Sequence, residues 1–225
     1  MKKIIFLVVI ITTNLNWILA QDSQKFNIGF ALDPGISWLH PDKAGVNSLH
    51  SKISFGYGVN LDLNFQPNYA LATGFFVNYR GGTLAYDSTV QFNSIDSVYA
   101  AGSQMSYNIE YITVPLVLKL STNEIGYSKY YGKLGVDLNI NVKPRGELTT
   151  FDGNTMSKID IGKDVLPMDI GLYAALGTAY NVTQNVYLTA ELFFHNGFID
   201  QLKFADGYDS KVVLNNIGLQ LGVQF

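Results

Sequence analysis

Strict alternation of apolar and polar side chains is the feature that most constrains how this chain can fold. Between Ile53 and Phe65 every odd position is apolar or aromatic, and every even position is polar or glycine. Side chains two residues apart share one face of a β-strand, so this strand has one apolar and one polar face. The run spans 13 residues. Strands of soluble proteins most often have about 5–6 residues, whereas tilted membrane-spanning strands need about 9–11.

Seven further segments alternate in the same way, so we expect eight strands. The first begins at Phe26 and extends past Leu32 toward Trp38. The others lie at 53–65, 69–80, 111–120, 133–142, 169–180, 186–195 and 217–225. Phe76 is an exception, because it is an aromatic residue on the polar face of its strand.

The connections between these strands alternate in length. Short ones are expected at 66–68, 121–128 and 181–184, and long polar ones at 39–50, 81–106, 143–166 and 197–210. Short turns at one end and long loops at the other are typical of an outer-membrane barrel. The sequence therefore predicts an all-β fold, an eight-stranded antiparallel up-and-down transmembrane β-barrel with four surface loops and both termini at the short-turn end.

The N-terminal segment predicts export. Lys2 and Lys3 precede the apolar stretch 4–11, and Ala20 ends the segment. This pattern predicts a signal peptide at 1–20 and a barrel domain at 21–225. The alternative is an uncleaved transmembrane anchor, but Asn14 and Asn16 shorten the apolar run below the roughly 20 residues that a span needs.

Composition excludes several classes of protein. Charged residues are 15% of the chain, against about 25% in a typical soluble domain. The net charge of −3 and the lack of a basic run argue against a nucleic-acid partner. The chain has no cysteine, which excludes disulfides, thiolate metal sites and cysteine nucleophiles.

A soluble lipocalin-like barrel is the alternative fold, because it would show the same alternation with its apolar face inward. The polar face here is dominated by Gly, Asn, Gln and Thr rather than by the Lys and Glu of a wet exterior. Aromatic residues such as Trp38, Tyr69 and Tyr180 gather near strand ends, as in an interfacial girdle. Both observations favour the membrane barrel.

Two segments resemble a known family. Residues 111–119 (YITVPLVLK) resemble the Y-x-x-[IV]-P-L-x-x-K strand of PorT-like outer-membrane proteins of Bacteroidetes, and 193–198 lie where that family often carries an aromatic-rich segment ending in Gly. The end of the chain, 218–225, is similar to the terminal signal of outer-membrane barrels. The resemblance implies an eight-stranded barrel in the outer membrane, a role linked to protein export, and a terminal Phe225 that the barrel-assembly machinery recognises.

Charged residues on the inward faces are the candidate site. An eight-stranded barrel encloses only enough room for side chains, and buried charges need partners. We therefore expect a packed network of ion pairs and hydrogen bonds that fills the lumen, with a polar path as the alternative. The predicted members are Asp62, Arg80, Lys119, Lys133, Asp137, Asp169 and Glu191.

Candidate catalytic and metal-binding residues are few. The histidines are His40, His50 and His195, and only His195 lies on an inward face. No serine is one or two positions from it, and Glu191 on the same strand is about 13–14 Å away at 3.4 Å per residue. We therefore predict no catalytic site, no metal site and no cofactor. Pro115 has no amide hydrogen, so it must leave one ladder bond unmade.

Three functions follow as hypotheses. The first is a non-enzymatic structural or binding barrel that presents four surface loops or assists protein export. The second is a lipid-modifying enzyme of the outer membrane, and the third is a narrow channel for small solutes. The expected partners are outer-membrane lipid, the barrel-assembly machinery during insertion, and envelope or secretion proteins.

Overall fold

The computed structural model describes residues 25–42, 45–183, 185–203 and 210–225. The predicted signal peptide lies outside these residues. No helix in the described residues is long and apolar enough to cross a bilayer. The strands are β1 (Phe26–Leu32), β2 (Gly35–Pro41), β3 (Val46–Gln66), β4 (Tyr69–Tyr86), β5 (Val90–Phe92), β6 (Ile95–Tyr99), β7 (Gln104–Ser121), β8 (Ser128–Thr149), β9 (Thr155–Asp160), β10 (Met168–Thr183), β11 (Val186–Gly197) and β12 (Val212–Gln224).

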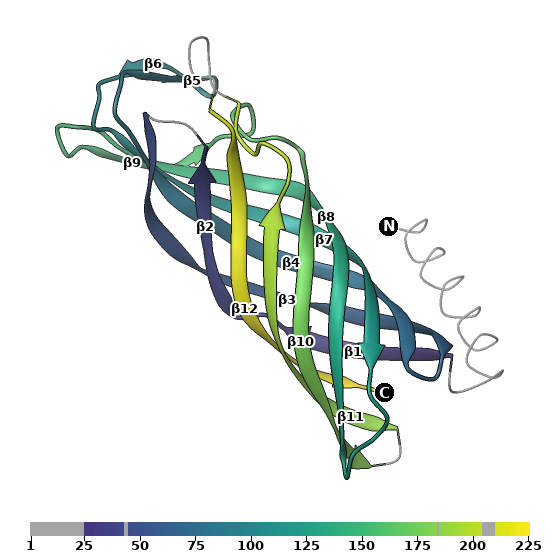
Figure 1. Ribbon diagram of the computed structural model, residues 1–225. Coiled ribbons are helices and arrows are strands. Elements are labelled where there is room, and N and C mark those ends of the chain that lie inside the picture. The colour runs from purple at the N-terminus through teal and green to yellow at the C-terminus, as the bar shows by residue number, and fades with distance from the viewer. Residues whose placement is uncertain (1–24, 43–44, 184, 204–209) are drawn as a thin grey trace, which may run out of the picture.

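The barrel is a closed ring of eight antiparallel strand positions (Figure 1). β1 and β2 together occupy one of these positions, since both pair with β12 on one side and with β3 on the other. The other seven positions are occupied, in chain order, by β3, β4, β7, β8, β10, β11 and β12. This arrangement confirms the predicted eight-stranded up-and-down barrel.

The break between β1 and β2 does not open the wall. Asp33 exchanges two backbone hydrogen bonds with Gly56 of β3, at 2.8 and 3.0 Å, and Pro34 O accepts one from Leu219 of β12 at 2.9 Å. The hydrogen-bonded ladder therefore continues through the kink on both sides.

The predicted long loops are shorter than expected. The short turns and the C-terminus lie at the lower end of Figure 1, and β5, β6 and β9 lie at the upper end, as the connection lengths predicted. However, residues 46–50, 81–86, 104–106 and 143–149 are strand rather than loop. They extend the wall beyond the lipid-facing part of the barrel, and β5, β6 and β9 are strands that the alternation did not predict.

Strand β7 shows why these extensions look like loops in the sequence. Its outward residues are polar from Gln104 to Glu110 and apolar from Ile112 to Leu120. Its inward residues change in the opposite sense, since Met105–Tyr111 are large and apolar, and Thr113–Lys119 are mostly smaller or polar. Both faces switch polarity at the same level, which marks the outer boundary of the lipid-facing belt.

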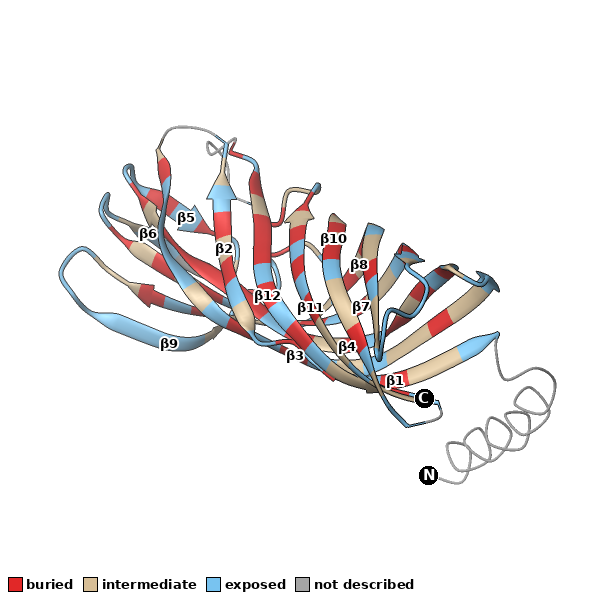
Figure 2. Cartoon of the chain, turned by 60° about the horizontal axis from the view of Figure 1, so that its bottom comes forward, coloured by how far each residue is buried: buried red, intermediate tan, exposed pale blue. Residues whose placement is uncertain are grey.

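Outward apolar side chains are exposed over the lower part of the barrel, where burial alternates along the strands in Figure 2. Leu176, Phe75 and Leu134 are 73, 69 and 60% exposed. The exceptional Phe76 is inward and only 5% exposed, so it fills the lumen. The predicted assignment of faces is correct, because in a soluble barrel the apolar residues would be inside.

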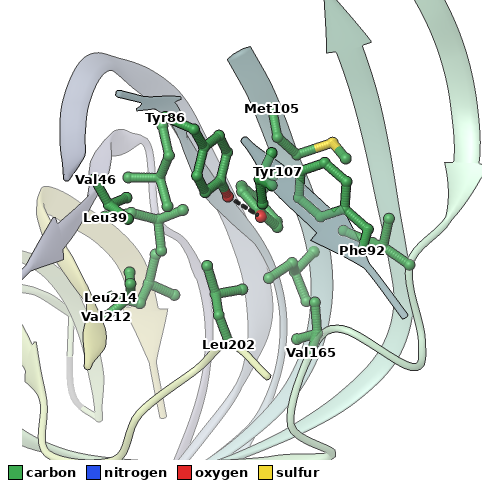
Figure 3. Packing of buried hydrophobic residues seen from close by; sticks show 14 of the residues in the cluster. Leu39, Val46, Tyr86, Phe92, Met105, Tyr107, Val165, Leu202, Val212 and Leu214 are labelled. Atoms are coloured by element: carbon green, nitrogen blue, oxygen red, sulfur yellow. Dashed lines mark hydrogen bonds between the residues drawn. The ribbon is translucent and has the colours of Figure 1, made fainter. Parts of the chain in front are cut away.

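A cluster of buried hydrophobic side chains fills the interior of the barrel above the lipid-facing belt (Figure 3). We call it the outer core. At its centre the hydroxyls of Tyr86 and Tyr107 are hydrogen-bonded at 2.6 Å. Burial raises the pKa of the Tyr107 phenol, so this pair is uncharged. The outer core consists of Leu39, Val46, Leu84, Tyr86, Val90, Phe92, Met105, Tyr107, Ile109, Tyr111, Leu148, Ile161, Val165, Leu202, Val212 and Leu214.

The assignment of faces predicts opposite outcomes at neighbouring positions. Leu61→Arg or Leu138→Arg places a charge on the lipid face and should cost roughly 2–4 kcal/mol of unfolding free energy. Asn60→Ser changes the adjacent inward position and should cost far less. Urea titration of the protein refolded in lipid vesicles measures both. Equal losses of unfolding free energy at the outward and inward positions would contradict the assignment.

Candidate functional site in the barrel lumen

Four of the predicted inward charges form two ion pairs in the half of the lumen nearer the short turns. Lys119 Nζ lies 2.6 Å from Asp62 Oδ2, and Lys133 Nζ lies 2.7 Å from Glu191 Oε2. Asp62 Oδ2 also accepts a hydrogen bond from the Gln224 side chain at 2.7 Å. All four charged side chains are at most 10% exposed. Each therefore depends on its partner, because water cannot replace the lost solvation.

The other three predicted residues meet nearer the outer mouth, around His195. The Nδ1 atom of His195 lies 2.9 Å from Asp137, and its Nε2 atom lies 3.5 Å from Asp169. Arg80 Nη1 is 3.9 Å from Asp137 Oδ2. All four side chains are buried. Both ring nitrogens of His195 face carboxylates, which makes the imidazole part of the polar network of the lumen.

The carboxylate partners of His195 were missed in the sequence because they lie on other strands. His195 is on β11, whereas Asp137 is on β8 and Asp169 is on β10. The register places Gly171 of β10 opposite Asp137, and Gly171 has no side chain to block the path. A methyl group at Gly171 would overlap the imidazole ring of His195. The alternation along each strand predicts that all four side chains point inward. Which of them are in contact depends on the pairing register between strands, which the alternation does not give.

One inward carboxylate was missed entirely. Asp33 lies at the break between β1 and β2, where the alternation is interrupted, and it is 7% exposed. A hydrogen bond with the Gln220 side chain engages it. With Asp33 included, the buried carboxylates outnumber Arg80, Lys119 and Lys133 in the lumen.

A small cavity lies between these groups. It has a volume of about 30 Å³, and Asp33, Arg80, Pro115, Lys133 and Phe193 are among the residues that line it. A buried site needs about 10–15 Å³ of such volume to hold one water molecule. A cavity of this volume has room for about two or three water molecules.

Pro115 interrupts the wall beside this cavity. Pairing between β4 and β7 stops at Ala72–Val117 and resumes at Phe76–Thr113 in the same register. The other side of β7 remains paired, with Pro115 opposite Asp137. The missing amide hydrogen thus breaks the ladder locally without creating a bulge.

The predictions about catalytic and metal sites concern His195 and the metal-binding residue types. His195 is fully buried, and no serine, threonine or lysine is hydrogen-bonded to it. The described part of the chain has no group of three or more His, Asp or Glu side chains that could hold a metal ion.

The last residue completes the wall. The backbone N–H of Phe225 donates to Ile28 O at 2.8 Å, and the N–H of Ile28 donates to Phe225 O at 3.2 Å. The ring of Phe225 points outward and is 53% exposed. The chain therefore ends at the seam between β12 and β1, with an aromatic side chain on the lipid-facing surface.

Comparison with known proteins identifies a family over most of the chain. Residues 19–203 match the family described as outer membrane protein beta-barrel domain. No curated protein matches. Similar solved structures include neisserial surface protein A (14% identity, TM-score 0.46, 88% of this chain and 95% of that chain). Others are OprG from Pseudomonas aeruginosa (12%, 0.43, 88% and 95%) and a major outer membrane protein from Thermus thermophilus (10%, 0.45, 88% and 99%).

Removing one charge of a buried ion pair should destabilise the barrel more than removing one charge of an exposed pair. Glu191→Gln leaves Lys133 charged and unpaired inside the barrel, and should cost roughly 3–5 kcal/mol of unfolding free energy. Lys133→Met in the same chain should recover much of that loss. The exposed pair Lys129–Glu124, at 3.9 Å, is the control, since Glu124→Gln should cost less than about 1 kcal/mol. Similar losses at both sites in urea titrations would show that Lys133 is not buried.

Proposed function

The chain belongs to the outer membrane protein beta-barrel domain family and lies in the outer membrane, and from this premise we propose that it is a closed, non-enzymatic barrel that presents a folded binding surface. The observation that carries the proposal is that the interior is filled at two levels. Ion pairs and buried apolar side chains such as Phe76 and Phe193 occupy the membrane-spanning part around a cavity of about 30 Å³, and the outer core lies above them.

The surface connections support a binding role because they pack together. The carboxylate of Asp164, in the connection between β8 and β10, accepts backbone hydrogen bonds from Asn93 at 2.5 Å and Ser94 at 3.1 Å. The backbone of Lys203, in the connection between β11 and β12, donates to Asp164 O at 2.7 Å. Asp164 thus joins three connections into one ordered surface, which lowers the entropy lost on binding a partner.

An enzymatic role is less well supported. A lipid-modifying enzyme must bring its reactive group within reach of a lipid molecule. His195 is the inward histidine, and it is completely buried below the outer core and held by Asp137 and Asp169. This position favours a structural role for it in the lumen.

Assistance to protein export is a narrower form of the same proposal. It rests on the PorT-like resemblance of 111–119, which form part of β7, and of the C-terminal strand. A barrel that cannot conduct would contribute to export through its surface or its periplasmic end rather than through its lumen. Secretion of exported proteins by a deletion strain, compared with the complemented strain, tests this role.

The closed lumen predicts that the barrel does not conduct. Liposomes that contain the refolded protein should not swell in solutions of small sugars or amino acids faster than protein-free liposomes. A porin of known conductance in parallel liposomes is the positive control. Swelling that rises with the amount of refolded protein would contradict the proposal and favour the channel.

We also propose that Phe225 is an assembly signal. Deleting it removes one exposed ring and two backbone hydrogen bonds at the seam, so the refolded barrel should lose little stability. In cells the amount in the outer membrane should fall several-fold, with the lost material degraded in the periplasm. Immunoblots of membrane fractions, together with heat-modified migration of the refolded protein, measure both quantities. If abundance and refolded stability fall together, Phe225 acts by packing alone.

A further inference from the structure

A groove of about 280 Å³ crosses the outer surface of the barrel. It runs from Lys52 of β3, over Gly81 of β4, to Lys143 and Arg145 of β8. Gly81 has no side chain, so Lys52 reaches across β4 to the Asn108 side chain of β7 at 2.7 Å.

The groove exists because β3 leaves β4 at this level. The register between the two strands shifts between Ser51 and Phe55. The backbone of Gly81, which would otherwise pair with β3, exchanges hydrogen bonds with the Ser37 hydroxyl at 2.9 Å. A built-in irregularity with satisfied backbone groups therefore forms the floor, and strand bulges of this kind commonly mark functional sites.

The groove lies at the outer edge of the lipid-facing belt. On β7 the outward residues change from Ile112 to Glu110 at this level, and on β8 they change from Val142 to Lys143. Ile53, which borders the groove, is 91% exposed. The groove therefore faces the head groups of the outer leaflet, with lipid chains below it.

Two cations of the groove have no carboxylate of the described residues within ion-pair distance, although the Glu147 carboxylate attracts Lys52 from farther away. Within the described residues neither Lys52 nor Lys143 forms an ion pair, although Glu110 lies directly opposite Lys143 in the ladder. Glu110 also lies close to the Tyr79 hydroxyl, which interacts most strongly with Tyr57. Arg145 is 3.3 Å from Asp160, but its side chain is 40% exposed and has donors to spare.

We propose that this groove binds the phosphorylated head group of an outer-leaflet lipid. Two ammonium groups and a guanidinium around a recess match the charge and the oxygen geometry of a phosphate monoester. The exposed Ile53 and the apolar belt below would contact the acyl chains of the same molecule. The inference depends on the location in the outer membrane and does not depend on the barrel being closed or non-enzymatic.

Native mass spectrometry of the refolded protein in detergent tests the proposal, with diphosphoryl lipid A and its dephosphorylated form as probes. Wild-type protein should bind the phosphorylated probe and bind the dephosphorylated one much more weakly. Lys143→Gln should weaken binding roughly fivefold, and Lys52→Gln with Lys143→Gln roughly thirtyfold. Glu110→Gln removes the opposing charge and should strengthen binding.

Lys163→Gln is the matched control, since Lys163 is exposed in the connection between β8 and β10, away from the groove. It should bind lipid A as the wild type does. Heat-modified migration verifies that each variant is folded. Equal affinity for both probes, or unchanged affinity in the double variant, would overturn the proposal. Competition by millimolar inorganic phosphate would show a site for a free anion rather than for a lipid.

Discussion

Satisfaction of backbone hydrogen bonds in lipid is the constraint on which the rest of this structure depends. A strand edge facing hydrocarbon leaves amide and carbonyl groups without partners, so the sheet must close on itself. Closure here runs through β12 and β1 to the last residue, where Phe225 and Ile28 exchange their hydrogen bonds. It also survives the kink at Asp33, because Gly56 pairs with it. A barrel of eight strands then has a lumen so narrow that side chains must fill it.

The membrane inverts the usual distribution of polarity over only part of each strand. Along β7, apolar residues face outward from Ile112 to Leu120 and inward from Met105 to Tyr111. The upper part of the wall is therefore ordinary water-soluble β-structure with a core of its own, continuous with a barrel whose apolar side is outside. The outer core and the ion pairs both lie inside, so neither is part of the protein's outer surface.

Period-two alternation was sufficient to predict the eight strands of the barrel over the lipid-facing belt and their lipid-facing sides, but not β5, β6, β9 or the strand extensions above the belt. It could not predict contacts between strands, because parity gives direction without register. The meeting of His195 with Asp137 was missed for this reason. The sequence predicts loops at 81–86 and 104–106 because the outward side chains there are small or polar. The inward Leu84, Tyr86 and Met105 were the signal that could have identified them as strand.

The charged lumen has a reason other than stability. Buried ion pairs rarely stabilise a protein more than well-packed apolar residues of similar volume. An apolar lumen, however, would make both faces of every strand apolar, and such segments associate with one another before they reach the membrane. Polar inward faces keep each strand amphipathic during passage through the periplasm. Once the barrel closes, those groups are buried and each charge needs a partner, which explains why Lys119 meets Asp62 and Lys133 meets Glu191.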